Sequence, residues 1–141
     1  MATIFTRIID GELPARLVWS DDRAVAMMDI RPLHPGHVLV IPRAEVDQWT
    51  DLEADLASHL MGVAHAVGTA QRAVVSCRRI GLLIAGFEVP HTHLHVIPVD
   101  GMADFDFSRA DTDPDPGQLD ELAQSLRDEM RRQGHGAAVP A

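Results

Sequence analysis

Residues 90–98 read Pro-His-Thr-His-Leu-His-Val-Ile-Pro, so histidine stands at positions 91, 93 and 95 between two prolines. Successive side chains of a strand point to opposite faces, so a strand here would place all three imidazoles on one face. Histidine is the side chain whose ordinary pKa lies nearest neutrality. The row therefore concentrates proton-transfer, nucleophilic or metal-binding capacity on one side of a sheet.

The spacing of the row bears on what it binds. At about 3.3 Å per residue, the backbones of His91 and His95 would lie about 13 Å apart along a strand. Nitrogens bound to one zinc lie about 2.0–2.1 Å from the metal, so all three histidines could share an ion only with strain. The spacing favours an extended polyanion lying along the row. A metal held by two of these histidines together with His34 or His37 stays open as an alternative.

Composition narrows the class of protein. The 141 residues are 46% hydrophobic, which suits a single domain over residues 1–141 with a real core. No apolar run approaches the roughly 18 residues of a membrane span, and we expect neither a secretion signal nor a membrane partner. The one cysteine, Cys77, rules out an intrachain disulfide and suits a reducing compartment such as the cytoplasm.

The charge balance limits the partners. The net charge is −9, and all twelve basic residues are arginine, a usage that hints at a GC-rich bacterial source. An acidic chain does not bind a nucleic-acid backbone by bulk charge, so we expect no nucleic-acid partner. Any phosphate ligand must then be held by local groups such as histidines and backbone N–H groups.

Hydrophobic periodicity predicts the elements that would position the row. Apolar residues recur every three or four positions over 52–74, which predicts a long packed helix. The almost wholly apolar run 37–42 predicts a central strand, and the rigid loop 29–36 precedes it. Residues 99–117 are acidic and loop-like, outside a core of about 3–98. The other expected elements are a short helix over 4–9, strands at 17–19, 24–28, 80–85 and 91–97, and a C-terminal helix over 118–132.

Four features, read together, resemble the histidine triad (HIT) family. They are His-x-His-x-His followed by two apolar residues at 91–97, the Pro-Gly-His strand at 35–42, Asp29-Ile30 and Ile4-Phe5, in collinear order from residue 3 to about 98. The resemblance implies an α+β fold, with an antiparallel sheet of about five strands and a packed helix, usually paired as a homodimer. It also implies hydrolysis or nucleotidyl transfer at the α-phosphate of a purine nucleotide, as in a nucleoside phosphoramidate or a dinucleoside polyphosphate.

The family's roles carry over residue by residue. His93 would be the nucleophile that forms a nucleotidyl-histidine intermediate, and His95 would contact the phosphate. His91 would orient the row, with His37 behind it. Asp29 would bind the ribose hydroxyls. The remaining substrate contacts implied are an apolar slot for the base, made by Ile4, Phe5, Ile8, Met27 and Ile30, and backbone near the phosphates at Gly86 and Val89.

Two departures from the family pattern matter. Many members carry Gly-Gln-Ser or Gly-Gln-Thr before the triad, where this chain has Gly86-Phe87-Glu88. Glu88 could serve as an acid if protonated and would repel phosphate if ionised. This keeps a non-catalytic nucleotide-binding module open as an alternative.

The second departure concerns metal. Members that hold a zinc use two cysteines near the amino terminus and a histidine after the Ile-Pro strand. Those places hold Thr3, Thr6 and Glu45 here. The resemblance therefore implies no metal and no other cofactor.

Overall fold

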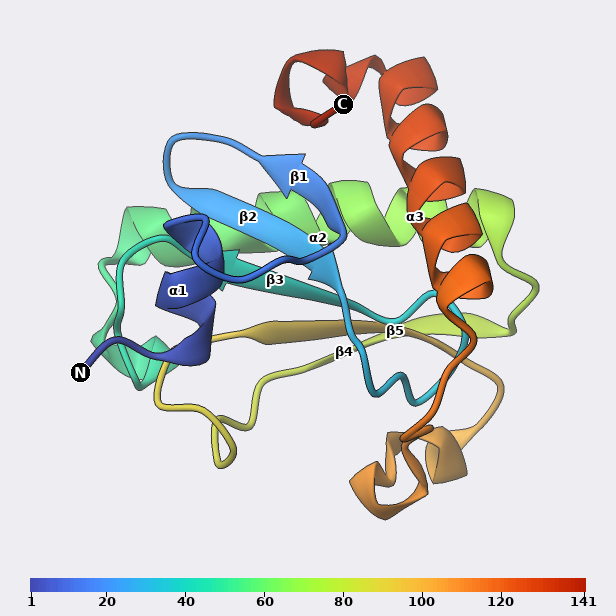
Figure 1. Cartoon of the computed structure of the whole chain (residues 1–141), viewed down its shortest axis with the longest axis horizontal. Helices are drawn as coiled ribbons and strands as arrows, with labels where there is room; N and C mark the ends of the chain where they lie inside the picture. Colours follow the sequence, from blue (N-terminus) through green and yellow to red (C-terminus); the bar gives the residue numbers. More distant parts are fainter.

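Five antiparallel strands form one sheet in the order β1-β2-β3-β5-β4 (Figure 1). The computed structural model describes all 141 residues. β3, which follows His37, and β5, which contains His95, lie inside the sheet, and β4 is an edge strand. The bounds are β1 Leu17–Ser20, β2 Ala24–Met28, β3 Val38–Pro42, β4 Arg79–Leu83 and β5 Leu94–Val99.

Helix α2 (Ala54–Val74) covers one face of the sheet, and α3 (Pro116–Met130) packs across α2 and β1 (Figure 1). The apolar stripe predicted for the long helix points into this layer: Leu60, Val63, Val67 and Ala70 are buried in the main core. None of the helices combines the length and the apolar composition that a membrane span needs.

The opposite face of the sheet carries α1 (Ile4–Ile9) and a smaller apolar cluster. Thr3 caps α1, since its side chain accepts the N–H of Thr6. The cluster joins Phe5 of α1 to alternate residues of β2 and β3, namely Val25, Met27, Leu39 and Ile41. Because side chains alternate along a strand, β2 and β3 serve both faces, as the unbroken apolar run at 37–42 predicted.

The α+β fold with a five-stranded antiparallel sheet is confirmed, but the histidine strand is shorter than predicted. β5 begins at Leu94, so His91 and His93 lie in the segment just before it. Pairing with β3 ends at Val40 opposite Leu94. Beyond that point the backbone N–H of Thr92 donates to the carbonyl of Val46 at 2.7 Å instead of continuing the ladder.

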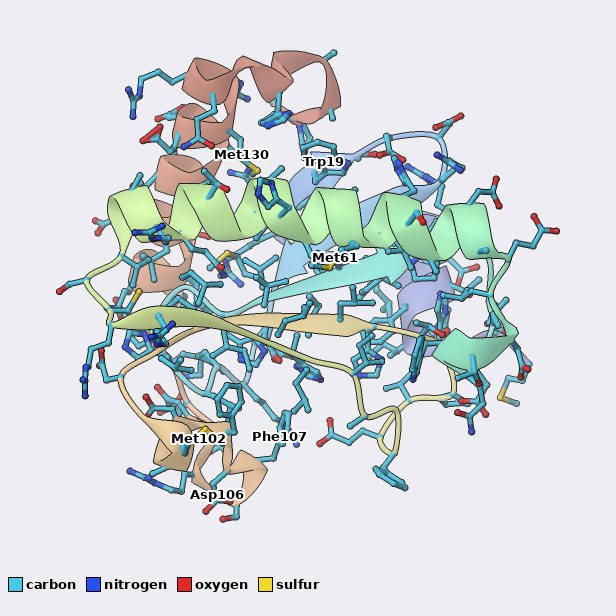
Figure 2. All side chains as sticks on the ribbon, turned by 180° about the vertical axis from the view of Figure 1, so that it is seen from behind. Trp19, Met61, Met102, Asp106, Phe107 and Met130 are labelled. Carbon is cyan, nitrogen blue, oxygen red and sulfur yellow. The ribbon has the colours of Figure 1, made fainter.

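The acidic segment after β5, which was expected to be loop-like, contains regular structure. It contains two short 3₁₀ turns, Met102–Phe105 and Phe107–Arg109, on the side of the sheet away from α2 (Figure 2). The ring of Phe105 packs where a side chain at position 81 would otherwise stand. Helix α3 then begins at Pro116, two residues before the predicted start.

Candidate active site

A pocket of about 700 Å³ opens on the face of the sheet that carries α1. Its walls come from α1, the end of β2, the loop before β5 and the 107–112 segment. Most of the predicted substrate residues line it, together with two of the three triad histidines: Ile4, Phe5, Ile8, Met27, Asp29, Ile30, Glu88, Val89, His93 and His95.

Three predicted site residues do not reach the pocket. His37 and His91 are fully buried behind its wall, where they contact the rings or backbone of the other histidines. Gly86 has φ of +85°, and a Cβ there would meet nothing within 4 Å. Glycine at 86 thus serves a left-handed turn rather than a close approach to neighbouring groups.

His37 fixes the proton positions of His95. The backbone N–H of Leu33 donates to His37 Nδ1 at 3.0 Å, so this nitrogen carries a lone pair and Nε2 carries the proton. His37 Nε2–H then donates to His95 Nδ1 at 2.9 Å. The proton of neutral His95 is therefore on Nε2. A backbone amide thus determines, through two imidazoles, that His95 presents an N–H donor.

The ring of His93 has the opposite arrangement. Its Nδ1 lies 2.7 Å from the carbonyl oxygen of His91, which can only accept, so Nδ1 carries the proton and Nε2 of the neutral ring has a lone pair. Nε2 of His93 and Nε2 of His95 make no hydrogen bond. Neither atom is fully buried, since Gln71 Oε1 is the only fully buried side-chain polar atom without a partner. Both nitrogens therefore reach the pocket that their residues line.

His91 holds the carbonyl that orients His93. Its Nε2–H donates to the carbonyl oxygen of Pro42 at 2.8 Å, and its Nδ1 accepts from the Thr3 hydroxyl at 2.8 Å. Glu45 accepts the backbone N–H of Thr3 at 2.8 Å and the hydroxyl of Thr6 at 2.7 Å. The residues at the zinc positions of other family members thus form a hydrogen-bonded cluster. Neutral hydroxyls are not among the thiolate, imidazole and carboxylate ligands that zinc takes, so the set does not fit that metal.

Two phenylalanines contact the two histidines that line the pocket. The rings of Phe5 and His93 meet edge to face with centroids 5.0 Å apart, and those of Phe107 and His95 do the same at 5.0 Å. Figure 2 shows Phe107 below the sheet, on the side away from α2. Phe107 was missed by sequence reasoning because it stands in an acidic segment that was read as loop; the only signal was aromatic residues at 105 and 107.

Other pocket residues were also missed. Arg31 follows Asp29 in the loop after β2, and its guanidinium is the one side-chain cation on the wall. The remaining unpredicted lining residues are small, apolar or hydroxyl-bearing: Leu13, Pro14, Ala15, Met28, Leu39, Ser108, Ala110 and Thr112.

Burial keeps the hydrogen-bonded imidazoles of His37 and His95 neutral. It lowers the pKa of His37 to about 3 and, with a smaller effect from His93, that of His95 to about 4. Burial also raises the pKa of the Asp29 carboxyl to about 6, and the charge of Glu88 acts in the same direction. At neutral pH the His37–His95 pair is therefore uncharged, and Asp29 is mostly ionised.

The positions of the buried histidines also bear on the alternative that they hold a metal ion. Ligand atoms of Asp29, His37 and His95 lie within 4.8 Å of one another, close enough to surround an ion. A metal at His37 Nε2 would have to replace the proton there while Nδ1 accepts the Leu33 N–H, which would require an imidazolate or a broken hydrogen bond. The hydrogen bonding of His37 thus argues against this cluster as a metal site.

Replacing Phe107 with alanine is expected to raise the pKa of His95 by roughly one unit, from about 4 toward the ordinary value of 6.5. The phenyl ring excludes water from one side of the imidazole, and its loss lets water solvate the charged form. An NMR titration of the imidazole C–H signals measures the shift. Phe87→Ala is the matched control, since Phe87 is 98% exposed. An unchanged titration of His95 in the Phe107 variant would show that the ring does not control its protonation.

Gly81→Ala is expected to destabilise the fold by about 1–3 kcal/mol, because the new Cβ would overlap the ring of Phe105 and displace the segment that carries Phe107. Urea unfolding gives the change in free energy. Gly62→Ala provides the comparison, since a Cβ at this position of α2 meets nothing within 4 Å. That change should stabilise by up to about 1 kcal/mol, the usual gain in a helix interior. Equal effects of the two substitutions would contradict the packing of Phe105 on Gly81.

Comparison with known proteins identifies the family of this chain. A family model described as HIT domain matches residues 10–102. An uncharacterised HIT-like protein of Methanocaldococcus jannaschii is 34% identical over 99 residues, covering 67% of this chain and 77% of that protein. The chain belongs to the histidine triad (HIT) family.

The relatives include a named enzyme and solved structures. The bifunctional bis(5′-adenosyl)-triphosphatase/adenylylsulfatase FHIT of Arabidopsis thaliana is 35% identical over 122 residues, covering 83% of this chain and 65% of the enzyme. The crystal structure of a zinc-bound histidine triad family protein from Mycobacterium smegmatis superposes with a TM-score of 0.81 at 26% identity, covering 96% of this chain and 98% of that one. Some members of the family are thus nucleotide hydrolases.

Proposed function

We propose that this chain is a nucleotide hydrolase or nucleotidyl transferase that acts at the α-phosphate of a purine nucleotide through a nucleotidyl-His93 intermediate. The observation that carries the proposal is the state of His93: Nδ1–H is held by the His91 carbonyl at 2.7 Å, and Nε2 faces the pocket with its lone pair. A neutral imidazole with this tautomer is ready to attack phosphorus.

The pocket can hold the nucleoside beside this nitrogen. Ile4, Phe5 and Ile8 of α1 face Met27 at the end of β2, forming an apolar slot for the base. Asp29 stands at the same end of β2, where its carboxylate can accept ribose hydroxyls. This placement leaves the α-phosphate over the triad.

The proposed reaction has two steps. The lone pair of His93 Nε2 forms a bond to the α-phosphorus, and the bond from phosphorus to the leaving group breaks. The electron pair goes to the leaving group, and an amine leaving group takes a proton from solvent as it departs. The ring is then cationic, and the His91 carbonyl stabilises the remaining Nδ1–H. In the second step the oxygen of water bonds to phosphorus, the N–P bond returns its pair to Nε2, and the water proton is released to solvent.

Two groups can stabilise the charge that develops on the phosphoryl oxygens. His95 presents its Nε2–H to the pocket, and Arg31 supplies a positive charge on the wall. Donors already in place where charge develops give the largest share of such stabilisation. His95 stays neutral well below pH 7, so it acts as a hydrogen-bond donor of fixed orientation rather than as a cation.

Trapping of the intermediate tests the proposal. Brief incubation with nucleoside phosphoramidates and dinucleoside polyphosphates that carry a labelled α-phosphate, followed by alkaline quenching, should leave label on the protein. A phosphorus–imidazole bond is lost in mild acid and survives alkali, which distinguishes it from a serine ester. Saturable AMP binding with no label and no turnover would instead favour the nucleotide-binding module.

Assembly and compartment remain predictions. An interface over α2 and the edge strand β4 would cover Met61 and Leu82, which are 53% and 42% exposed, and this supports the proposed homodimer. The single free Cys77 supports a reducing compartment such as the cytoplasm.

A further inference from the structure

Three side chains with a full charge line the pocket, and two of them are acidic. Asp29 and Glu88 carry carboxylates, and Arg31 carries the guanidinium. His95 adds no positive charge at pH 7, because burial lowers its pKa to about 4. In the proposed reaction His93 attacks as a neutral ring. The pocket is therefore net negative at pH 7, although it would hold a phosphate ester.

Glu88 is the acidic group that no binding role accounts for. None of the eight ion pairs in the structure involves it. Glu88 lines the same pocket as His93, which follows it by five residues in the chain. The charge of Glu88 acts on Asp29, the residue just after β2, because it helps raise the pKa of that carboxyl.

Positive groups are too few for a chain of phosphates. The α-phosphate can use Arg31 and the Nε2–H of His95, and no other side-chain cation lines the pocket. A second or third phosphate would bring more negative charge into a pocket that has no further side-chain cation, whereas an amine with a positive charge would be attracted to Glu88. The base and ribose are uncharged, so the leaving group is the part of the substrate whose charge can vary.

We infer that Glu88 selects the substrate by the charge of its leaving group, favouring a nucleoside 5′-monophosphate joined to a cationic amine over one joined to further phosphates. This inference rests on the proposed function and narrows it from phosphoramidates and polyphosphates to the former. Glu88 acts here as a specificity residue, with no proton transfer assigned to it.

Three adenylated substrates test the inference with the full-length chain. One is the phosphoramidate of a short diamine, whose free amino group is cationic at pH 7. The second is the phosphoramidate of a monoamine of the same length, which is neutral. The third is diadenosine triphosphate, whose leaving group is anionic. For each, kcat/KM is measured for the wild type, Glu88→Gln and Glu121→Gln, the last being a matched loss of one carboxylate on the exposed surface of α3.

The wild type should rank the substrates cationic, neutral, anionic. In Glu88→Gln the ratio of kcat/KM for the cationic to the anionic substrate should fall about two- to fivefold, the effect of losing one solvent-exposed charge pair. Glu121→Gln should leave that ratio unchanged. Raising the salt concentration should reduce the wild-type ratio, because salt screens charges near solvent.

The outcomes separate the two proposals. Covalent labelling with a preference for diadenosine triphosphate, or a ratio that Glu88→Gln does not alter, would overturn the charge selection and leave the proposed function standing. Absence of turnover and of label with all three substrates would overturn the proposed function, and the selection with it.

Discussion

Replacing His93 with alanine is expected to abolish covalent labelling and to lower kcat by at least about a thousandfold. The nucleophile supplies the whole covalent pathway, so its removal leaves only the binding of substrate and the electrostatics of the pocket. Stopped-time labelling and steady-state turnover measure the two effects. Added imidazole offers a sharper readout in His93→Gly, where a free ring can occupy the vacated space and restore part of the turnover.

His65→Gln is the matched control for this experiment. His65 lies on α2, on the other side of the sheet from the pocket, and is exposed. The variant should label and turn over as the wild type does. Retained labelling in His93→Ala would assign the nucleophile to another residue and refute the tautomer argument built on the carbonyl of His91.

Acidification from pH 6.5 toward pH 3 is expected to lower the free energy of unfolding by several kcal/mol, with His37 and His95 as major causes. Their pKa values are about 3 and about 4 in the folded chain, against 6.5 when exposed. The unfolded chain therefore binds protons that the folded chain does not bind. The stabilisation from these two neutral histidines is complete above pH 6.5 and is lost as the pH falls toward their folded pKa values. One unit of pKa difference corresponds to about 1.4 kcal/mol.

Asp29 opposes this trend over part of the range. The pKa of its carboxyl is about 6 in the folded chain, above the ordinary 3.8. The stabilisation that Asp29 contributes is therefore complete below pH 3.8 and is lost as the pH rises through 6. One carboxyl shifted by about two units does not offset two imidazoles that are each shifted by more. The net slope of stability between pH 6.5 and 4 therefore stays positive.

The His37→Asn variant isolates the larger histidine contribution. The asparagine carbonyl can still accept the Leu33 N–H, but the titrating ring and its bond to His95 are gone. The slope of the unfolding free energy against pH should become shallower below pH 6.5, as measured by urea unfolding at several pH values. His65→Gln should keep the wild-type slope. A His37→Asn slope as steep as that of the wild type would mean that His37 is not the buried neutral base described here.

Loss of His37 should also impair the reaction. Without the donated Nε2–H, His95 is free to carry its proton on Nδ1 and would then offer the pocket a lone pair instead of a donor. This links the acid lability of the fold to the function of the site, because the same buried pair controls both.

The sequence was sufficient to predict the elements and the row of histidines. Apolar residues at steps of three and four predicted α2, the unbroken run at 37–42 predicted a central strand, and the alternating histidines predicted a site beside it. These are periodic signals that each segment carries by itself. The order of the motifs was enough to relate the chain to the histidine triad family.

The tertiary structure decided what each imidazole does. The backbone groups of Leu33, Pro42 and His91 set the tautomers of His37, His91 and His93, respectively. No pattern in the sequence places a particular backbone amide or carbonyl against a particular ring nitrogen.

Long-range packing decided two further features of the site, the contact of Phe107 with His95 and the position of Glu88. The ring of Phe107 contacts His95, and Phe105 of the same segment packs on Gly81. Glu88 lines the same pocket as Asp29, although 59 positions separate them. Composition marked the first segment as acidic loop and left the surroundings of Glu88 open. Burial and electrostatic interactions between distant residues act through space, and their effect depends on distances that only the folded chain defines.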